Sequence, residues 1–286
     1  MGTSNSATGP KGNQPNLLPP WAPENPMPST PPASSPDGNE GEQPKDQQEN
    51  QTPNDSLRPP SVSWNQPKAA LTSFANRGGS GRLKKTVRNY VKARGGASTA
   101  AITGRSGRKT TARLANFIAS GIKEGFAEAA KKLGIQDITS RNVHSVLADF
   151  IDKIAPVGAT IENTIARKAL IATITEIFED MEVENKGIGV LDQIKEEDMQ
   201  KIIISSIANY INERFQQELI NRLERSKIDA DYANQLSMQI RDYIIGLIKL
   251  DISDNNIKNY DWESSEGTKR IQDYYEKAYR LLGEEK

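Results

Sequence analysis

The stretch Glu196 to Lys227, EEDMQKIIISSIANYINERFQQELINRLERSK, decides the fold because it is the longest run of helical periodicity in the chain. Its large apolar side chains recur at steps of three and four residues, so they share one face of an α-helix. At about 1.5 Å per residue, the stretch predicts a core helix that approaches about 50 Å in length. The inward positions are Met199, Ile203, Ile204, Ile207, Ile211, Phe215, Leu219 and Leu223.

Stretches with the same periodicity lie on both sides of this run, and none shows the alternation of period two that marks a strand. Gly134 closes one of them as a C-terminal cap, and Pro156 stops another. The predicted fold class is therefore all-α, a helical bundle domain at residues 108–286 with enough length for a core. The other predicted helices cover residues 108–133, 140–154, 160–182 and 230–251, with a last one after Asn256.

A long disordered arm rich in Pro and Gly is predicted to precede this domain. Fifteen of the sixteen Pro residues lie at or before Pro67, among many Gly, Ser, Asn and Gln residues. The arm divides into an extended leader at residues 1–23 and a disordered linker at residues 24–81. A basic amphipathic helix and a flexible Gly-rich connection, residues 82–107, then join the arm to the bundle.

Isolated apolar side chains in the linker, Trp64, Leu71 and Phe74, are expected to be solvated or loosely packed. The leader, MGTSNSATGPKGNQPNLLPPWAP, carries its own apolar tip in an otherwise polar, Pro-rich setting. Such a tip is typical of a docking peptide. The other interpretation is an ordinary disordered tail with a few stray hydrophobic residues.

The N-terminus itself matches the myristoylation pattern, with Gly2 exposed after removal of Met1 and Ser6 at the sixth position. That pattern is short and has low specificity. Its more general consequence is that Gly2 would carry a small, unhindered amine at the tip of a flexible arm, and such an amine can enter a deep active site.

Charge is balanced overall, with 37 Lys and Arg against 37 Asp and Glu, but it is segregated along the chain. Residues 1–55 hold seven acids and two Lys, residues 56–123 hold fourteen bases and no acid, and residues 124–286 hold thirty acids and twenty-one bases. Two interpretations of the cationic segment stay open. It binds nucleic acid through counterion release, or it contacts the acidic C-terminal domain of its own chain.

Catalytic equipment is sparse, since the chain has no Cys and one His. This composition excludes disulfides, cysteine nucleophiles and thiolate zinc sites, and we expect no enzyme, no cofactor and no metal. His144 stands five and eight residues before Asp149 and Asp152, and these spacings do not converge on a helix, so it is interpreted as a structural residue. The N-terminus lacks a signal-peptide pattern and no apolar run approaches about 20 residues, which predicts a cytoplasmic protein without a membrane partner.

The segment Gly104-Arg-Ser-Gly107-Arg-Lys109-Thr110-Thr111 resembles a phosphate-binding loop at first sight. A Walker-type loop needs Gly directly before Lys, four residues between its glycines and a strand leading in. Here only two residues separate Gly104 from Gly107, and no strand is predicted upstream. We interpret the segment as a basic flexible joint.

Several stretches of the chain together resemble the QatB family, a component of the four-gene bacterial Qat anti-phage defence systems. The resemblance covers most of the chain, and its most specific parts are the N-terminus and the ATIENTIARKAL helix. The stretches are MGTS, GPKG and LLPPWAP in the leader, then LKKTVRNYVKARGGAS, RLANFI and GATIENTIARKALIATITEI.

This resemblance implies a non-enzymatic protein that acts beside an ATPase, a QueC-like enzyme called QatC, and a TatD-like nuclease. QueC-like relatives in defence systems act on the N-terminal glycine of a partner protein. The resemblance therefore assigns modification to Gly2, with Thr3 and Ser4 as neighbours in the active-site channel. The leader tip would dock on QatC through Leu17, Leu18, Pro19, Pro20 and Trp21.

The alternative function is a basic nucleic-acid-binding adaptor that brings the defence complex to phage DNA or RNA. It follows from the positive face of the predicted basic helix, since such a face neutralises phosphates. The residues that would make this contact, or the contact with an acidic protein surface, are Arg82, Lys84, Lys85, Arg88 and Lys92.

Overall fold

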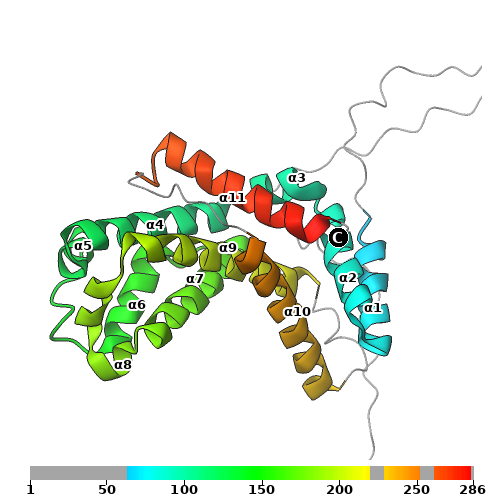
Figure 1. Ribbon diagram of the computed structural model, residues 1–286, viewed down its shortest axis with the longest axis horizontal. Coiled ribbons are helices and arrows are strands. Elements are labelled where there is room, and N and C mark those ends of the chain that lie inside the picture. Colours follow the sequence, from blue (N-terminus) through cyan, green and yellow to red (C-terminus); the bar gives the residue numbers. More distant parts are fainter. Residues whose placement is uncertain (1–62, 220–228, 252–260, 285–286) are drawn as a thin grey trace, which may run out of the picture. The chain divides into compact units, whose positions relative to one another are not determined.

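Every regular element in the described part of the chain is a helix (Figure 1). The computed structural model describes residues 63–219, 229–251 and 261–284. The all-α prediction is confirmed. The α-helices are α1 (Asn65–Arg77), α2 (Ser80–Ala93), α3 (Gly96–Thr103), α4 (Arg105–Glu124), α5 (Phe126–Lys132), α6 (Val143–Ile154), α7 (Ile161–Asp180), α8 (Val183–Lys186), α9 (Glu196–Glu218), α10 (Ala230–Asp251) and α11 (Ser265–Gly283), and a 3-10 helix, η1, spans Ile188–Gln193.

Helix α9 contributes to both hydrophobic cores, as expected for the stretch with the strongest helical pattern. It packs on α4, α7, α10 and α11, and its side chains at Ile207, Ile211 and Phe215 are completely buried. The rest of the predicted central run, residues 220–227, lies outside the described residues. Helix α10 has the bounds that the sequence predicts.

Two clusters of buried side chains form the interior. The larger one joins α1, α2 and α3 to α9, α10 and α11, and it contains the fully buried aromatic residues Tyr90, Phe215 and Tyr275. The second one lies among α4 to α8 and η1, around Phe117, Phe126 and Phe150. Helices α4, α7 and α9 supply residues to both clusters and so connect them.

Helix α1 overturns part of the linker prediction. Residues 65–77 are helical, and Leu71 and Phe74 are only 2% and 1% exposed, so they belong to the core rather than to a solvated linker. Trp64 packs edge-on to Tyr90 with 6.1 Å between ring centroids. Pro67 is compatible with the helix because it stands in the first turn, where a missing amide breaks no intrahelical bond.

Helix α3 overturns the predicted flexible connection. The segment 97–107 is helical except at Gly104, where α3 meets α4, and Ala100 and Ala101 are completely buried. Small side chains there allow α3 to pack closely on α11. The helical body therefore begins at α1, and the boundary predicted at residue 108 is wrong.

The helix predicted over residues 108–133 is divided in two. Gly125 takes a φ of 87°, which ends α4 and starts α5, and the free amide of Phe126 donates to Asp192 Oδ1 at 2.8 Å. Gly134 takes a φ of 79° after α5, which confirms the predicted C-terminal cap. The glycine break turns α5 back over the second core.

No helix in the described ranges combines the length and the hydropathy needed to cross a membrane.

Candidate interaction site

The leader residues assigned by resemblance precede the described part of the chain. Gly2, Thr3, Ser4, Leu17, Leu18, Pro19, Pro20 and Trp21 all lie within residues 1–62, so their roles stay predictions. The described residues instead bear on the second predicted site, the cations of α2.

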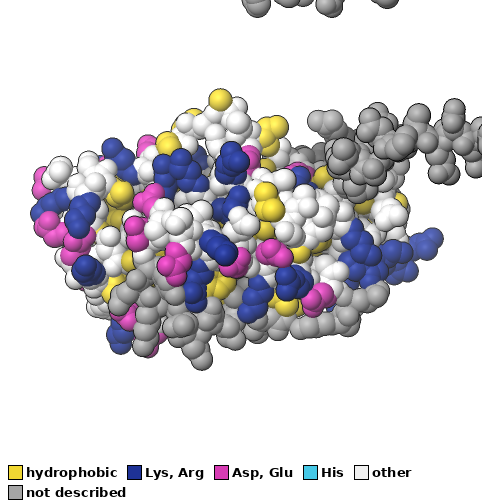
Figure 2. Space-filling view, turned by 90° about the horizontal axis from the view of Figure 1, so that it is seen from above, with side chains coloured by type: hydrophobic (Ala, Val, Ile, Leu, Met, Phe, Trp, Pro, Cys, Tyr) yellow, Lys and Arg dark blue, Asp and Glu magenta, His cyan; other side chains and the backbone are white. Residues whose placement is uncertain are grey.

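Helix α2 has one face in the core and one face at the surface. Its apolar side chains follow the helical repeat, and its exposed face is mainly basic. Of the predicted cations, Arg88 is partly buried and the other four are exposed. Figure 2 shows Lys and Arg side chains gathered at the end of the body where α1 and α2 lie. The buried apolar positions are Leu83, Val87, Tyr90, Val91 and Ala93, the buried polar ones are Thr86 and Asn89, and the exposed cations are Arg82, Lys84, Lys85 and Lys92.

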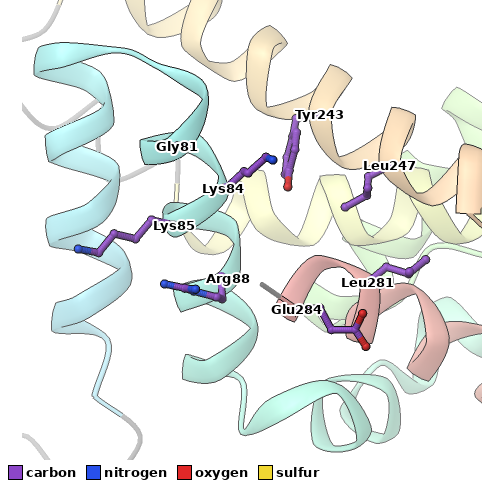
Figure 3. A pocket seen from close by; sticks show the side chains of 8 residues that line it. All are labelled: Gly81, Lys84, Lys85, Arg88, Tyr243, Leu247, Leu281 and Glu284. Carbon is purple, nitrogen blue, oxygen red and sulfur yellow. The ribbon is translucent and has the colours of Figure 1, made fainter. Parts of the chain in front are cut away.

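A hollow of about 450 Å³ opens between α2, α10 and the end of α11, and we call it the α2–α10 hollow (Figure 3). Helix α2 supplies a basic wall, and the other two helices supply an apolar wall of partly buried side chains that pack against the larger core. The hollow is lined by Gly81, Lys84, Lys85, Arg88, Tyr243, Leu247, Leu281 and Glu284.

A second hollow, the α1–α2 hollow, lies on the other side of α2 and measures about 430 Å³. Its α1 side consists of small or uncharged side chains, and its α2 side carries Arg82 and Lys85. Lys85 therefore borders both hollows. The lining residues are Gln66, Ala69, Ala70, Ser73, Arg82, Lys85 and Asn89.

The C-terminal half of the cationic segment has a different environment. Arg94 pairs with Glu218 of α9 at 3.1 Å, and Arg113 lies 3.8 Å from Glu263. Arg108 donates to the side-chain oxygen of Gln272 on α11. These three cations contact the acidic C-terminal part of the chain, so the internal interpretation of the basic segment holds for them.

A buried polar network explains why Arg94 faces inward. Glu218 accepts from the Tyr90 hydroxyl at 3.0 Å, from Arg94 Nη1 at 3.1 Å and from Arg214 Nε at 3.2 Å. Arg214, only 4% exposed, also donates to the Ala100 carbonyl at 2.9 Å. The network thus holds α2 and α3 against α9. None of the sequence-based predictions includes this network, although Arg214, an arginine on the apolar stripe of α9, is a signal of it in the sequence.

Protonation in this network follows from burial. Desolvation raises the pKa of Glu218 above its usual range, against the opposing effect of the neighbouring Arg214. Burial also raises the pKa of Tyr90 and of Tyr279, so both phenols stay protonated. Tyr90 donates to Glu218, and the Tyr279 oxygen accepts from Arg214 Nη1 at 3.4 Å. The arrangement is suited to fixing helices in register.

The segment that resembles a phosphate loop is occupied by protein groups. The amide of Ser106, at the start of α4, donates to Glu162 Oε1 at 2.7 Å, and the Ser106 hydroxyl donates to Asn163 Oδ1 at 2.7 Å. The ring of Tyr210 covers Gly107, where a Cβ would lie 2.6 Å from Cζ of that ring. A carboxylate already satisfies this helix start, and the glycine there makes room for an aromatic ring.

His144 lies at the surface with its side chain 74% exposed, 3.6 Å from Glu184. Asp149 pairs with Arg141 at 2.7 Å, and Asp152 pairs with Arg167 at 2.5 Å. The three residues therefore have separate partners and do not converge. Within the described ranges, no group of three His, Asp or Glu side chains could hold a metal ion.

Comparison with protein families places the chain in the class of anti-phage defence components. The family model described as "Qat anti-phage system associated protein QatB" matches residues 95–282, which is more than half of the chain. The chain therefore belongs to the QatB family and is a component of the Qat anti-phage system. Comparisons with curated proteins and with solved structures give no match.

The family match begins at Gly95, directly after α2. It therefore includes the apolar wall of the α2–α10 hollow, at Tyr243, Leu247 and Leu281, and leaves out the basic wall. The leader also lies outside the matched residues.

Proposed function

We propose that this chain is a non-enzymatic cytoplasmic component of the Qat system that binds the QueC-like enzyme QatC and is modified by it at Gly2. Membership of the QatB family supports a role inside a multiprotein defence system. The leader sequence supports the specific role, because Gly2, Thr3 and Ser4 are small residues at the start of a Pro-rich segment with an apolar tip. The ATPase and the TatD-like nuclease of the same system are further proposed partners.

The leader would work in two parts. Removal of Met1 leaves the Gly2 amine without a side chain beside it, so it can reach an enclosed ATP-dependent site. Leu17, Leu18 and Trp21 would bind the surface of QatC and hold the intervening residues in register, with Pro19 and Pro20 limiting the conformations that binding must restrict.

Intact-mass spectrometry of the chain co-expressed with QatC tests the modification. We expect the wild type to gain mass at its N-terminal peptide and Gly2→Pro to keep the unmodified mass. Ser6→Ala is the matched control, because it disrupts the myristoylation pattern and leaves Gly2 in place. An unmodified wild type would overturn the modification, and a mass gain that Ser6→Ala abolishes would point to acylation instead.

Docking of the leader tip is tested separately by co-purification. Trp21→Asp is expected to reduce recovery of QatC by about tenfold, because an aromatic anchor is often a major contributor to binding. Leu57→Asp, which changes an apolar residue outside the leader, is the control. Equal recovery with both variants would contradict the docking role.

Nucleic-acid binding is the second candidate function, and the exposed cations of α2 favour it. If it holds, the logarithm of the affinity for a 20-base-pair duplex falls linearly with the logarithm of the salt concentration, by about 0.9 per phosphate contacted. Removing one contacting cation, as in Lys84→Ala, is expected to reduce that slope by about 1, and Lys277→Ala on α11 is the control. Fluorescence anisotropy with a slope near zero would exclude this function.

A further inference from the structure

The α2–α10 hollow combines two chemically different walls. On one side stand the cations Lys84, Lys85 and Arg88 of α2, and on the other the apolar side chains Leu247 and Leu281 with the ring of Tyr243. Leu247 and Leu281 are partly buried and pack against the larger core, so the hollow is an opening onto that core. A volume of about 450 Å³ is within the range, about 300–1,000 Å³, of sites that hold ligand groups.

Charge on the described lining is strongly unbalanced. The described lining includes three cations, of which Lys84 and Lys85 are exposed, and one carboxylate, that of Glu284 just after α11. Cations beside an apolar surface favour an occupant with negative charge at its edge and apolar groups at its centre, because that arrangement pairs the rim charges and removes the apolar wall from water. An occupant with only one of these properties would leave one wall unsatisfied.

The cations diverge around α2. In Figure 3, the Lys84 ammonium extends toward Tyr243, whereas Lys85 and Arg88 extend toward α1. A compact anion such as a single phosphate group needs donors that converge on one point. The divergence instead fits an occupant that crosses α2 and presents separate carboxylates to separate cations, and Lys85 borders the α1–α2 hollow as well.

We propose that the α2–α10 hollow binds a segment of a partner protein in which acidic residues flank one or two large apolar side chains. The apolar side chains insert against Leu247 and Leu281, and the carboxylates pair with Lys84 and Lys85 at the rim. This surface is built from residues outside the leader, and the proposal does not depend on modification of Gly2. Nucleic acid fits less well, because its phosphodiester backbone offers no apolar side chain to the leucine wall.

A displayed library of random twelve-residue peptides, selected against the full-length chain, tests this proposal without a choice of sequence in advance. We expect the enriched peptides to carry at least two Asp or Glu residues around Leu, Phe or Trp. Enrichment of basic peptides, of acidic peptides without a large apolar residue, or of no peptide would overturn the proposal.

Charge reversal at the rim then tests whether the selected peptides bind at the α2–α10 hollow. The double variant Lys84→Glu and Lys85→Glu changes two exposed side chains, and we expect it to weaken peptide binding by about tenfold or more in fluorescence anisotropy. Lys92→Glu is the matched control, because Lys92 is exposed on the same helix and does not line the hollow. Equal losses in the two variants would assign the effect to net charge and overturn the proposal.

The apolar wall needs its own variant. Leu281→Ala shortens one partly buried side chain of the wall, and it is expected to weaken peptide binding while circular dichroism shows an intact helical fold. A twenty-nucleotide single strand serves as the competing probe. If that strand displaces the peptide and its own binding is lost in both the rim variant and Leu281→Ala, the hollow is a nucleic-acid site and the proposal is wrong.

Discussion

The two halves of the acid-free cationic segment contrast in what their charges touch. In α2, Arg82, Lys84, Lys85 and Lys92 are exposed, and two of them border a hollow with an apolar wall. Farther along the segment, Arg94, Arg108 and Arg113 reach α9, α11 and Glu263 just before α11. Arg105 and Lys109 in the same part are exposed. The same residue types, within one basic run, therefore serve as surface groups in α2 and, at three arginines of the other half, as internal links.

Helical phase and position account for the difference. The exposed cations of α2 lie opposite its apolar stripe, whereas Arg94 stands just after the helix, where the chain turns toward the buried carboxylate of Glu218. Placing an arginine beside a desolvated acid is favourable only when both groups find partners. A net-charge count along the sequence cannot make this distinction, because it ignores the direction in which each side chain points.

The largest effect should come from removing the shared internal acceptor. Glu218→Ala leaves Arg214 buried without its carboxylate and Tyr90 without its acceptor, so we expect a loss of about 3–5 kcal/mol in the free energy of unfolding. Glu284→Ala, at the edge of the α2–α10 hollow, is the control and should change stability by less than about 0.5 kcal/mol. Urea denaturation measures both. Equal losses of unfolding free energy in Glu218→Ala and Glu284→Ala would contradict the distinction between the two halves.

A smaller loss should follow from a methyl group in the internal half. Gly107→Ala places a Cβ against the ring of Tyr210, and overpacking of this kind costs about 1–3 kcal/mol. Gly81→Ala is the matched change in the surface half, where the structure leaves open space, and helix propensity predicts a gain of about 0.5–1 kcal/mol. Thermal unfolding measures both variants. A lower melting temperature for Gly107→Ala with a higher one for Gly81→Ala would support the contrast between the halves, and a lower melting temperature for both would contradict it.

The internal half should also show a pH dependence that the surface half lacks. Burial raises the pKa of folded Glu218, so the folded chain keeps a proton that the unfolded chain has released. The free energy of unfolding is then expected to fall as pH rises from about 4.3, the pKa of an unperturbed Glu, through the raised pKa of the folded state. Glu218→Gln should remove this component of the pH dependence, which denaturation at several pH values would show. If Glu218→Gln leaves the pH dependence of stability unchanged, another group is responsible for it.

The smallest effect is expected at the surface. Reversing Lys84 and Lys85 together to Glu should change the free energy of unfolding by less than about 0.5 kcal/mol, because these exposed side chains are outside the buried network. A loss above about 2 kcal/mol in denaturation would show that α2 depends on its positive face for folding.

The sequence predicted the helices whose apolar residues follow a strong repeat, and it missed those held mainly by packing. Helix α10 has the predicted bounds, since its stripe from Leu236 to Ile248 is regular. Helix α3 has almost no amphipathic pattern, and contact with α11 keeps it in place. In α1, a Pro in the first turn and few apolar residues resembled a linker.

The candidate site was predicted only on one side. The cations of α2 are adjacent in sequence and form a recognisable basic face. The apolar wall comes from α10 and α11, where Tyr243, Leu247 and Leu281 follow the same periodicity as core residues, and nothing local shows that a hollow exposes them. Only the three-dimensional packing joins segments so far apart.

Hydrogen bonds between residues far apart in the sequence also determine when the helices can complete their packing during synthesis. Tyr90 meets Glu218 across 128 residues, and Thr111 meets Tyr275 across 164, at 3.0 Å in both cases. Contacts between segments so distant in sequence form late, because the loop between them must close first. The ribosome must therefore release α11 before α2, α3 and α4 acquire their final partners, and a nascent chain that stalls earlier exposes apolar faces to chaperones and proteases.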